Sequence, residues 1–233
     1  CFAIMSALVI SNQVNFMNHV DWGFDTENLL QIKMKVRDRA PLMEEIKNLP
    51  MVEDIINTSF FTVYENSDQL GPSSVSGVEW EKKPIDFNPI FQTYEVDEYF
   101  IDKMKLKIID GREIINEDFT RGYQANKVVI NKRAQKIMEM DNPIGQNITV
   151  PANWFTSEGR GKESYEIVGV VEDFHTVGLH SEIPPLIIKG ARFGNDGYFK
   201  YVRVMPGMEE EAIIAINNLV PQFRPDNENE TLA

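Results

Sequence analysis

The residues best suited to chemistry lie in one short segment, between positions 172 and 180. It contains two carboxylates and two imidazoles, Glu172, Asp173, His175 and His180. Both groups are common ligands of zinc and other transition metals. If the segment continues a strand, Asp173 and His175 share one face of it, because side chains alternate with a period of two. A metal site is therefore one interpretation of this cluster.

The other interpretation of the cluster is structural, and we favour it. The segment is then a turn after a buried strand, in which Asp173 accepts hydrogen bonds from backbone N–H groups and Phe174 enters the core. The remaining histidine, His19, lies near the other end of the chain, and the chain has a single cysteine, Cys1. Since no second group of ligands occurs at a suitable spacing, we predict no metal and no cofactor in this domain.

A second segment with binding potential is the Asp-Gly-Arg sequence at residues 110–112. The guanidinium of Arg112 could bind an anion through two parallel hydrogen bonds. The structural alternative, which we prefer, is that Gly111 adopts a positive φ in a tight turn. Arg112 then pairs with a nearby carboxylate, either Glu113 or Asp118.

The sequence contains none of the common nucleotide-binding or hydrolase patterns. Glycines are frequent at residues 157–163 (SEGRGKE), but they form neither the dinucleotide-binding nor the Walker pattern. No serine lies in the G-x-S-x-G context of α/β-hydrolases. We therefore predict no catalytic residues, and an extracytoplasmic hydrolase is the least favoured function.

Large aromatic residues in polar surroundings are candidates for contact with a partner, because tryptophan is frequent among binding hot spots. We expect Trp22, Trp80, Trp154 and Phe155 to be exposed. Trp154 and Phe155 flank a polar, glycine-rich hairpin tip at residues 155–163, which makes this tip the preferred contact surface. The structural interpretation of these residues, which we slightly favour, is core packing at the end of a strand.

The spacing of apolar residues predicts an alternation of strands and helices along the chain. Strands are expected at residues 28–35, 51–61, 78–81, 90–96, 127–130, 145–151, 165–171 and 198–204. Helices are expected where Asp38, Asp97 and Asn131 can serve as N-caps, and at residues 207–220. Polar loops are expected at residues 65–76 and 190–197, and the first is the best candidate for a domain boundary.

The composition is that of a folded domain with an acidic surface. The chain has 233 residues, of which 42% are hydrophobic, and a formal net charge of -13. Such a surface repels phosphate backbones, so we predict no nucleic-acid partner. The helical pattern of residues 2–20 turns polar after Ser11, as in a helix that leaves a membrane. We expect the sequence to begin inside a longer protein, since residues 1–10 are half of a span.

Four stretches of the sequence are informative when they are taken together and in order. They are residues 13–34 (QVNFMNHVDWGFDTENLLQIKM), 97–114 (DEYFIDKMKLKIIDGREI), 128–148 (with VVINKRAQKIM and NPIGQNI) and 165–188 (YEIVGVVEDFHTVGLHSEIPPLII). Together they resemble the MacB-like periplasmic core domain of FtsX-type ABC transporter permeases, in the form found in Bacteroidetes. The resemblance extends over residues 13–225.

The resemblance implies an α+β fold in two parts that follow a stalk. The end of a transmembrane or stalk helix is expected at residues 1–20, and a porter-like subdomain of split βαβ units at residues 21–61 and 190–233. An inserted mixed α/β subdomain, similar to the one called the Sabre, is expected at residues 62–189. The positions that carry the family signature are expected to have structural roles: Gly23, Phe24, Gly111, Arg112, Asn131, Gly169, Asp173, Phe174 and His175.

The resemblance also implies a function that needs no chemistry in this domain. The family consists of inner-membrane permeases, and the resemblance implies that this chain is the periplasmic domain of one of them. This domain is expected to dock a partner or substrate and to transmit ATP-driven motion in export, lipoprotein handling or efflux. The expected partners are a cytoplasmic ABC ATPase, a second permease copy in a dimer, and a periplasmic protein or a lipoprotein or peptide substrate. The alternative is a membrane-anchored periplasmic domain that binds a small ligand in a cleft.

Overall fold

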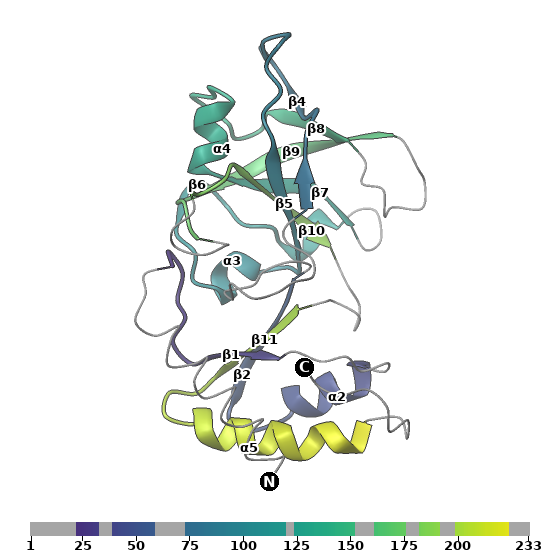
Figure 1. Cartoon of the computed structure of the whole chain (residues 1–233), viewed down its shortest axis with the longest axis vertical. Coiled ribbons are helices and arrows are strands. Elements are labelled where there is room, and N and C mark those ends of the chain that lie inside the picture. Colours follow the sequence, from purple (N-terminus) through teal and green to yellow (C-terminus); the bar gives the residue numbers. More distant parts are fainter. Residues whose placement is uncertain are drawn as a thin grey trace. The chain divides into compact units, whose positions relative to one another are not determined.

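The computed structural model describes residues 22–32, 39–58, 73–119, 124–151, 161–175, 182–191 and 199–223. These residues form a mixed α/β structure with few helices (Figure 1). The chain divides into two compact units, a smaller one with residues 26–56 and 194–233 and a larger one with residues 21–25 and 57–193. The predicted stalk helix and the predicted contact residues Trp154 and Phe155 lie outside the described residues. No helix in the described part of the chain is long and apolar enough to cross a membrane.

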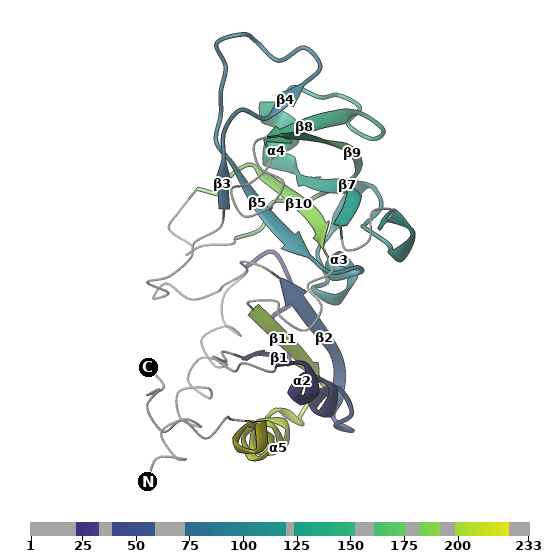
Figure 2. The same cartoon turned by 90° about the vertical axis from the view of Figure 1, so that its right-hand side faces the viewer.

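The smaller unit contains strands β1 (Leu29–Ile32), β11 (Phe199–Val204) and β2 (Val52–Thr58), which are paired in that order. β1 and β11 run antiparallel, with Leu29 opposite Arg203. Helices α2 (Arg39–Lys47) and α5 (Glu209–Leu219) lie together on one side of these strands in Figure 2, and the short helix η2 (Val220–Phe223) follows α5. Strands from distant parts of the sequence therefore share one sheet.

The core of the smaller unit follows from the spacing of its apolar residues. Leu30 and Ile32 occupy the same face of β1, and Ala212 and Ile216 lie one helical turn apart on the buried side of α5. These four residues belong to one buried cluster with residues of α2 and β11. The helix predicted at residues 207–220 is confirmed as α5.

The larger unit contains a mixed sheet whose strands follow the order β5, β10, β7, β9, β8, β4. Their bounds are Phe91–Val96 (β5), Leu186–Ala191 (β10), Gln124–Asn131 (β7), Lys162–Val171 (β9), Asn147–Pro151 (β8) and Glu79–Trp80 (β4). The additional strands β3 (Ser73–Val75) and β6 (Ile108–Gly111) pair with β5 and β9. β10 is parallel to β5 and antiparallel to β7, whereas β7 is parallel to β9.

Short helices connect the strands of the larger unit. They are α3 (Phe100–Lys103), η1 (Asn116–Asp118) and α4 (Lys132–Ile137). α4 begins directly after β7, and the N-cap predicted at Asn131 is confirmed, because its Oδ1 accepts the Ala134 N–H at 2.9 Å. Ala134 then packs into a buried cluster with residues of β7, β9 and β10.

Three local predictions in the larger unit are wrong, and the first is the loop at residues 65–76, because Ser73–Val75 form β3. The loop expected from residue 190 begins later, because β10 continues through Gly190 to Ala191. A Cβ on Gly190 would lie 2.7 Å from the Ala125 Cβ, so the missing side chain permits this close packing. Asp97 does not cap α3, since the N-cap residue is Tyr99, which has a φ of 62° and no side-chain cap hydrogen bond.

Candidate functional site

The carboxylates of Glu172 and Asp173 bind structural partners instead of converging on one point. Glu172 forms an ion pair with Lys132 of α4 at 2.8 Å, and the hydrogen bond from Lys132 holds the pKa of Glu172 below its ordinary value. The Asp173 Oδ1 accepts the backbone N–H of Arg133 at 2.8 Å, in the first turn of the same helix. These contacts tie the chain after β9 to the start of α4.

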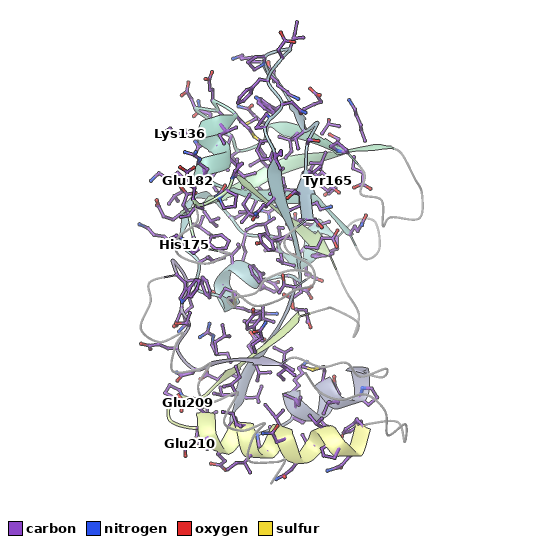
Figure 3. All side chains as sticks on the ribbon, viewed as in Figure 1. Lys136, Tyr165, His175, Glu182, Glu209 and Glu210 are labelled. Atoms are coloured by element: carbon purple, nitrogen blue, oxygen red, sulfur yellow. The ribbon has the colours of Figure 1, made fainter. Side chains whose placement is uncertain are left out.

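The histidines do not complete a ligand set in the described structure. The His175 backbone N–H donates to the Trp22 carbonyl at 2.8 Å, and Figure 3 shows His175 on the same side of the larger unit as Glu182. β9 ends at Val171, so residues 172–175 follow the strand, as the favoured structural interpretation predicts, and the strand geometry that the metal interpretation required is absent from them. His180 lies outside the described residues. Among the described residues, no group of His, Cys, Asp or Glu side chains could hold a metal ion.

Three of the signature positions pack against one another. Phe174 is buried, and its ring lies edge to face with that of Phe24 at 6.4 Å between centroids. Gly23 has a φ of +82°, and a Cβ built on it would lie 2.9 Å from the Phe174 Cβ. In this conformation the chain before β1 can pass directly over Phe174, as the structural interpretation of the segment expects.

The guanidinium of Arg112 is held by a carboxylate and is not left open for an anion. Nη1 and Nη2 donate to the two oxygens of Asp118 at 2.6 and 2.8 Å. Burial alone would raise the pKa of Asp118, but the hydrogen bonds from Arg112 and from the Ile115 N–H outweigh burial, and the pKa lies below its ordinary value. Of the two carboxylates proposed from the sequence, Asp118 is the partner.

Two glycines allow β6 and β9 to approach each other closely. Gly111 and Gly169 are paired across the two strands. Gly111 has a φ of +70°, and a Cβ on Gly169 would lie closer than 3.0 Å to the Arg112 carbonyl oxygen. The Arg112 N–H also donates to the Val168 carbonyl at 2.9 Å, so the two backbones are joined at this point.

The expectation that Trp22 and Trp80 are exposed is wrong, because both side chains are buried. The Trp80 ring lies edge to face with Phe87 and Phe91, at 6.2 and 6.1 Å between centroids. The Lys83 Nζ lies 5.3 Å from the centre of the Trp80 ring. Pairing of β4 with β8 places Trp80 in the sheet, and this pairing is not visible in the local sequence.

A groove of about 390 Å³ opens beside Trp80, and we call it the α4 groove. One wall is the β4–β5 loop, which stands at the top of the larger unit in Figures 1 and 2, and the other is the chain from the end of α4 towards β8. The lining residues are Trp80, Glu81, Lys82, Pro84 and Phe87 on the first wall, and residues 137–142 and Gln146 on the second.

Both walls of the α4 groove are fixed by local hydrogen bonds. In the β4–β5 loop, the Phe87 N–H donates to the Pro84 carbonyl at 3.1 Å. In the other wall, the Gln135 Nε2 donates to the Met140 carbonyl at 3.0 Å. The groove is therefore formed in advance, which lowers the entropic cost of binding.

Sequence reasoning missed the α4 groove, although one signal was present. Residues 84–90 (PIDFNPI) place Ile85, Phe87 and Ile90 in a segment that is otherwise rich in turn-forming residues. Several apolar residues in such a loop are unusual unless they pack or make contacts. The second wall comes from a distant part of the chain, and no local pattern connects it to this loop.

Asp97 is a buried carboxylate that joins distant parts of the larger unit. Its Oδ2 accepts the Asn57 N–H and Nδ2 at 3.3 and 3.1 Å and the Lys103 Nζ at 3.3 Å. Its Oδ1 is buried and has no hydrogen-bond partner in the described structure. Burial raises the pKa of Asp97 from 3.8 to about 6, because it outweighs the opposing effects of Lys103 and Asn57.

The raised pKa of Asp97 predicts how stability depends on pH. The protonated carboxyl of Asp97 contributes to the free energy of unfolding. This contribution is fully present below the ordinary pKa of 3.8 and is lost as the pH rises through about 6. The corresponding free energy is about 3 kcal/mol. We expect the unfolding free energy of the Asp97→Asn variant, relative to that of the original chain, to increase by this amount from about pH 3 to about pH 7. Urea denaturation at several pH values measures it, and a constant difference would show an ordinary pKa.

No protein-family model matches the sequence, and no curated protein matches it. Solved structures with a similar fold include the extracellular domain of the noncanonic ABC-type transporter YknZ from Gram-positive bacteria, with 14% identity, a TM-score of 0.50 and coverage of 83% of this chain and 93% of that one. The periplasmic region of MacB from Actinobacillus actinomycetemcomitans has 14% identity and a TM-score of 0.51, with 84% of each chain covered.

A third similar structure is a domain assigned to a permease protein from Porphyromonas gingivalis. It has 16% identity and a TM-score of 0.52, with 86% of this chain and 84% of that chain covered. All three are parts of transporters or permeases, and two of them are extracellular or periplasmic regions. The chain therefore has the fold of these transporter and permease domains, the periplasmic region of MacB among them.

Proposed function

We propose that this chain is the periplasmic domain of an ABC transporter permease in the inner membrane, where it docks a partner or substrate and transmits ATP-driven motion. The likeness of its fold to extracellular and periplasmic transporter domains carries the proposal. The α4 groove and the exposed apolar residues beside it add support, since both are features of contact surfaces. This function requires no catalytic residue and no cofactor in the domain.

The two compact units support an assignment of the two expected subdomains. We assign the porter-like subdomain, expected at residues 21–61 and 190–233, to the smaller unit, which combines β1, α2 and β2 with β11 and α5. The unit itself is narrower than expected, because residues 21–25, 57–61 and 190–193 belong to the larger unit. We assign the inserted Sabre-like subdomain, residues 62–189, to the mixed sheet of the larger unit. The stalk at residues 1–20 would then lead from the membrane into the porter-like subdomain.

The proposed partners follow from the same role. ATP hydrolysis is assigned to a separate cytoplasmic ABC ATPase, and two copies of the permease are expected to act as a dimer. The stalk would deliver the motion, since a continuous helix can transmit rigid-body displacement in a hinge or shear transition. The proposed processes are export, lipoprotein handling or efflux, with a lipoprotein, a peptide or a periplasmic protein docked in the periplasm.

Insertion of two glycines after Asn12 in the full permease is expected to uncouple ATP turnover from transport. Glycine weakens a helix by about 1 kcal/mol per residue relative to alanine, so the stalk would lose its stiffness. ATP hydrolysis and transport should be measured together in reconstituted membranes, with hydrolysis retained and transport lost. Two alanines inserted at the same place add the same length but favour the helix, and they serve as the control. Unchanged transport after the glycine insertion would contradict the proposal that the stalk transmits the motion.

A membrane-anchored ligand-binding domain is the second candidate, and the volume of the α4 groove favours it. At about 390 Å³ the groove falls within the range of about 300–1,000 Å³ found for small-ligand pockets. A small ligand that binds the isolated chain tightly, and that is displaced from this groove by competition, would favour this candidate over the docking domain.

A further inference from the structure

The apolar surface of the larger unit extends beyond the α4 groove along the β4–β5 loop. Phe87 lines the groove and is 40% exposed, and Ile85 and Ile90 on the same loop are 100% and 63% exposed. Single exposed apolar residues are ordinary, but several in one loop beside a groove mark an interaction surface. A ligand confined to the groove would leave Ile85 in water. An occupant that also covers the loop would remove more apolar surface from water than one confined to the groove.

The floor of the α4 groove is suited to an apolar side chain. Trp80, Met138 and Met140 line it and are themselves buried. Methionine side chains are flexible and polarisable, so they adapt to the shape of an inserted group. Tryptophan provides a large, rigid surface at low entropic cost and is frequent among binding hot spots.

The rim of the α4 groove is acidic. Its charged residues are Glu81, Glu139 and Asp141 against one cation, Lys82, which gives a net charge of -2 from three negative charges and one positive charge. All four are exposed, and none of them forms an ion pair with another residue in the described ranges. The whole chain also carries a net charge of -13. Such a rim attracts a cationic segment and repels an anionic lipid surface.

The turns that carry this rim have an unusual backbone. Lys82 and Glu139, one on each wall, have φ values of 67° and 52°. A left-handed conformation costs a residue other than glycine roughly 1–2 kcal/mol, so the surrounding structure must impose it. At Glu139 this conformation is a common way to end a helix, since the residue directly follows Met138, the C-cap of α4.

We propose that the α4 groove binds a segment of a partner protein that places an apolar side chain against Trp80 and carries lysine or arginine on either side. The inference rests on the proposed docking function and adds to it the docking surface and the chemistry of the partner. Phe87 and Ile85 cover the apolar part of the segment, and the three rim carboxylates face its cations.

The binding test uses the 233-residue chain and a fluorescein-labelled peptide with a central Phe-Leu pair and two lysines on each side. Fluorescence anisotropy is expected to show saturable binding. The same peptide with glutamates in place of the lysines is expected to bind about tenfold more weakly or worse, because it meets like charges at the rim. Salt at about 1 M, where the Debye length is about 3 Å, should remove most of this difference.

Variants on the loop and rim locate the binding. Phe87→Ser and Ile85→Ser are each expected to lower the affinity for the lysine peptide by about tenfold. The double variant Glu139→Gln, Asp141→Asn is expected to reduce the preference for lysine over glutamate peptide. The matched control is Ile214→Ser on α5 of the smaller unit, since Ile214 is 62% exposed and should leave the affinity unchanged.

Other results would overturn the proposal. Equal binding of the two peptides would exclude charge recognition, and equal binding by the Phe87→Ser variant would exclude the groove. Binding to phosphatidylglycerol vesicles that depends on Ile85 and Phe87, without peptide binding, would assign the loop to a membrane surface. The glycine insertion after Asn12 leaves the groove untouched. If the peptide test fails but the glycine insertion uncouples ATP turnover from transport, the groove is excluded as the docking surface, and the proposed function is still supported.

Discussion

Replacement of Asn131 by alanine is expected to lower the free energy of unfolding by about 4 kcal/mol. The side chain is fully buried, and its Oδ1 accepts both the Ala134 N–H at 2.9 Å and the Leu186 N–H at 2.8 Å. Its Nδ2 donates to the Pro184 carbonyl at 2.9 Å. The variant loses the cap of α4 and leaves the polar groups at the start of β10 without a partner. Urea denaturation followed by circular dichroism measures the change.

Two further variants separate the parts of this effect. Asn131→Ser can still cap α4 but cannot reach the start of β10, so it should recover about 1 kcal/mol of the loss. Asn147→Ala removes an exposed asparagine from β8 and should change stability by less than about 0.5 kcal/mol. If Asn131→Ala lowers the free energy of unfolding by only about 1 kcal/mol, as expected for a lost N-cap, the hydrogen bonds to the start of β10 contribute nothing to stability.

Replacement of Gly169 by alanine is expected to lower the free energy of unfolding by about 3 kcal/mol. The new Cβ would lie closer than 3.0 Å to the Arg112 carbonyl oxygen, which is a backbone atom. The β6 strand can retreat only if the hydrogen bond from the Arg112 N–H to the Val168 carbonyl is stretched or broken. The same denaturation experiment measures the effect.

Gly161→Ala is the matched control for this substitution. Gly161 lies directly before β9, and a Cβ built on it would meet no heavy atom within 4 Å. Alanine there should be neutral, or stabilising by about 0.4–1 kcal/mol through the unfolded state. Equal stability of the two variants would mean that β6 and β9 are not held together at this point.

Predictions from the sequence succeeded where the determining contacts are local. Asn131 caps α4 through the N–H three residues later, and Arg112 pairs with Asp118, which lies six residues away. Apolar periodicity likewise located α5. In each case the residues that determine the structure lie close together in the sequence, so that a local sequence pattern includes all of them.

The predictions failed where the contacts are distant. The carboxylate of Asp97 binds Asn57, 40 residues away, so it was unavailable as the helix cap that its position in the sequence favoured. The six-residue strand β10 is buried on both faces and shows no alternation, and its parallel partner β5 lies far back in the chain. The α4 groove depends in the same way on the pairing of β4 with β8.

The pairing of β1 with β11 also bears on how the chain is made. Leu29 lies opposite Arg203, so the smaller unit joins strands that are separated by residues 57–193 of the larger unit. Domains generally fold as units during synthesis, starting with those completed first. The larger unit can therefore fold before β11 exists, whereas β1, α2 and β2 must wait for β11 and α5 with their apolar sides uncovered. This early segment is the part of the chain that we expect chaperones to protect during synthesis.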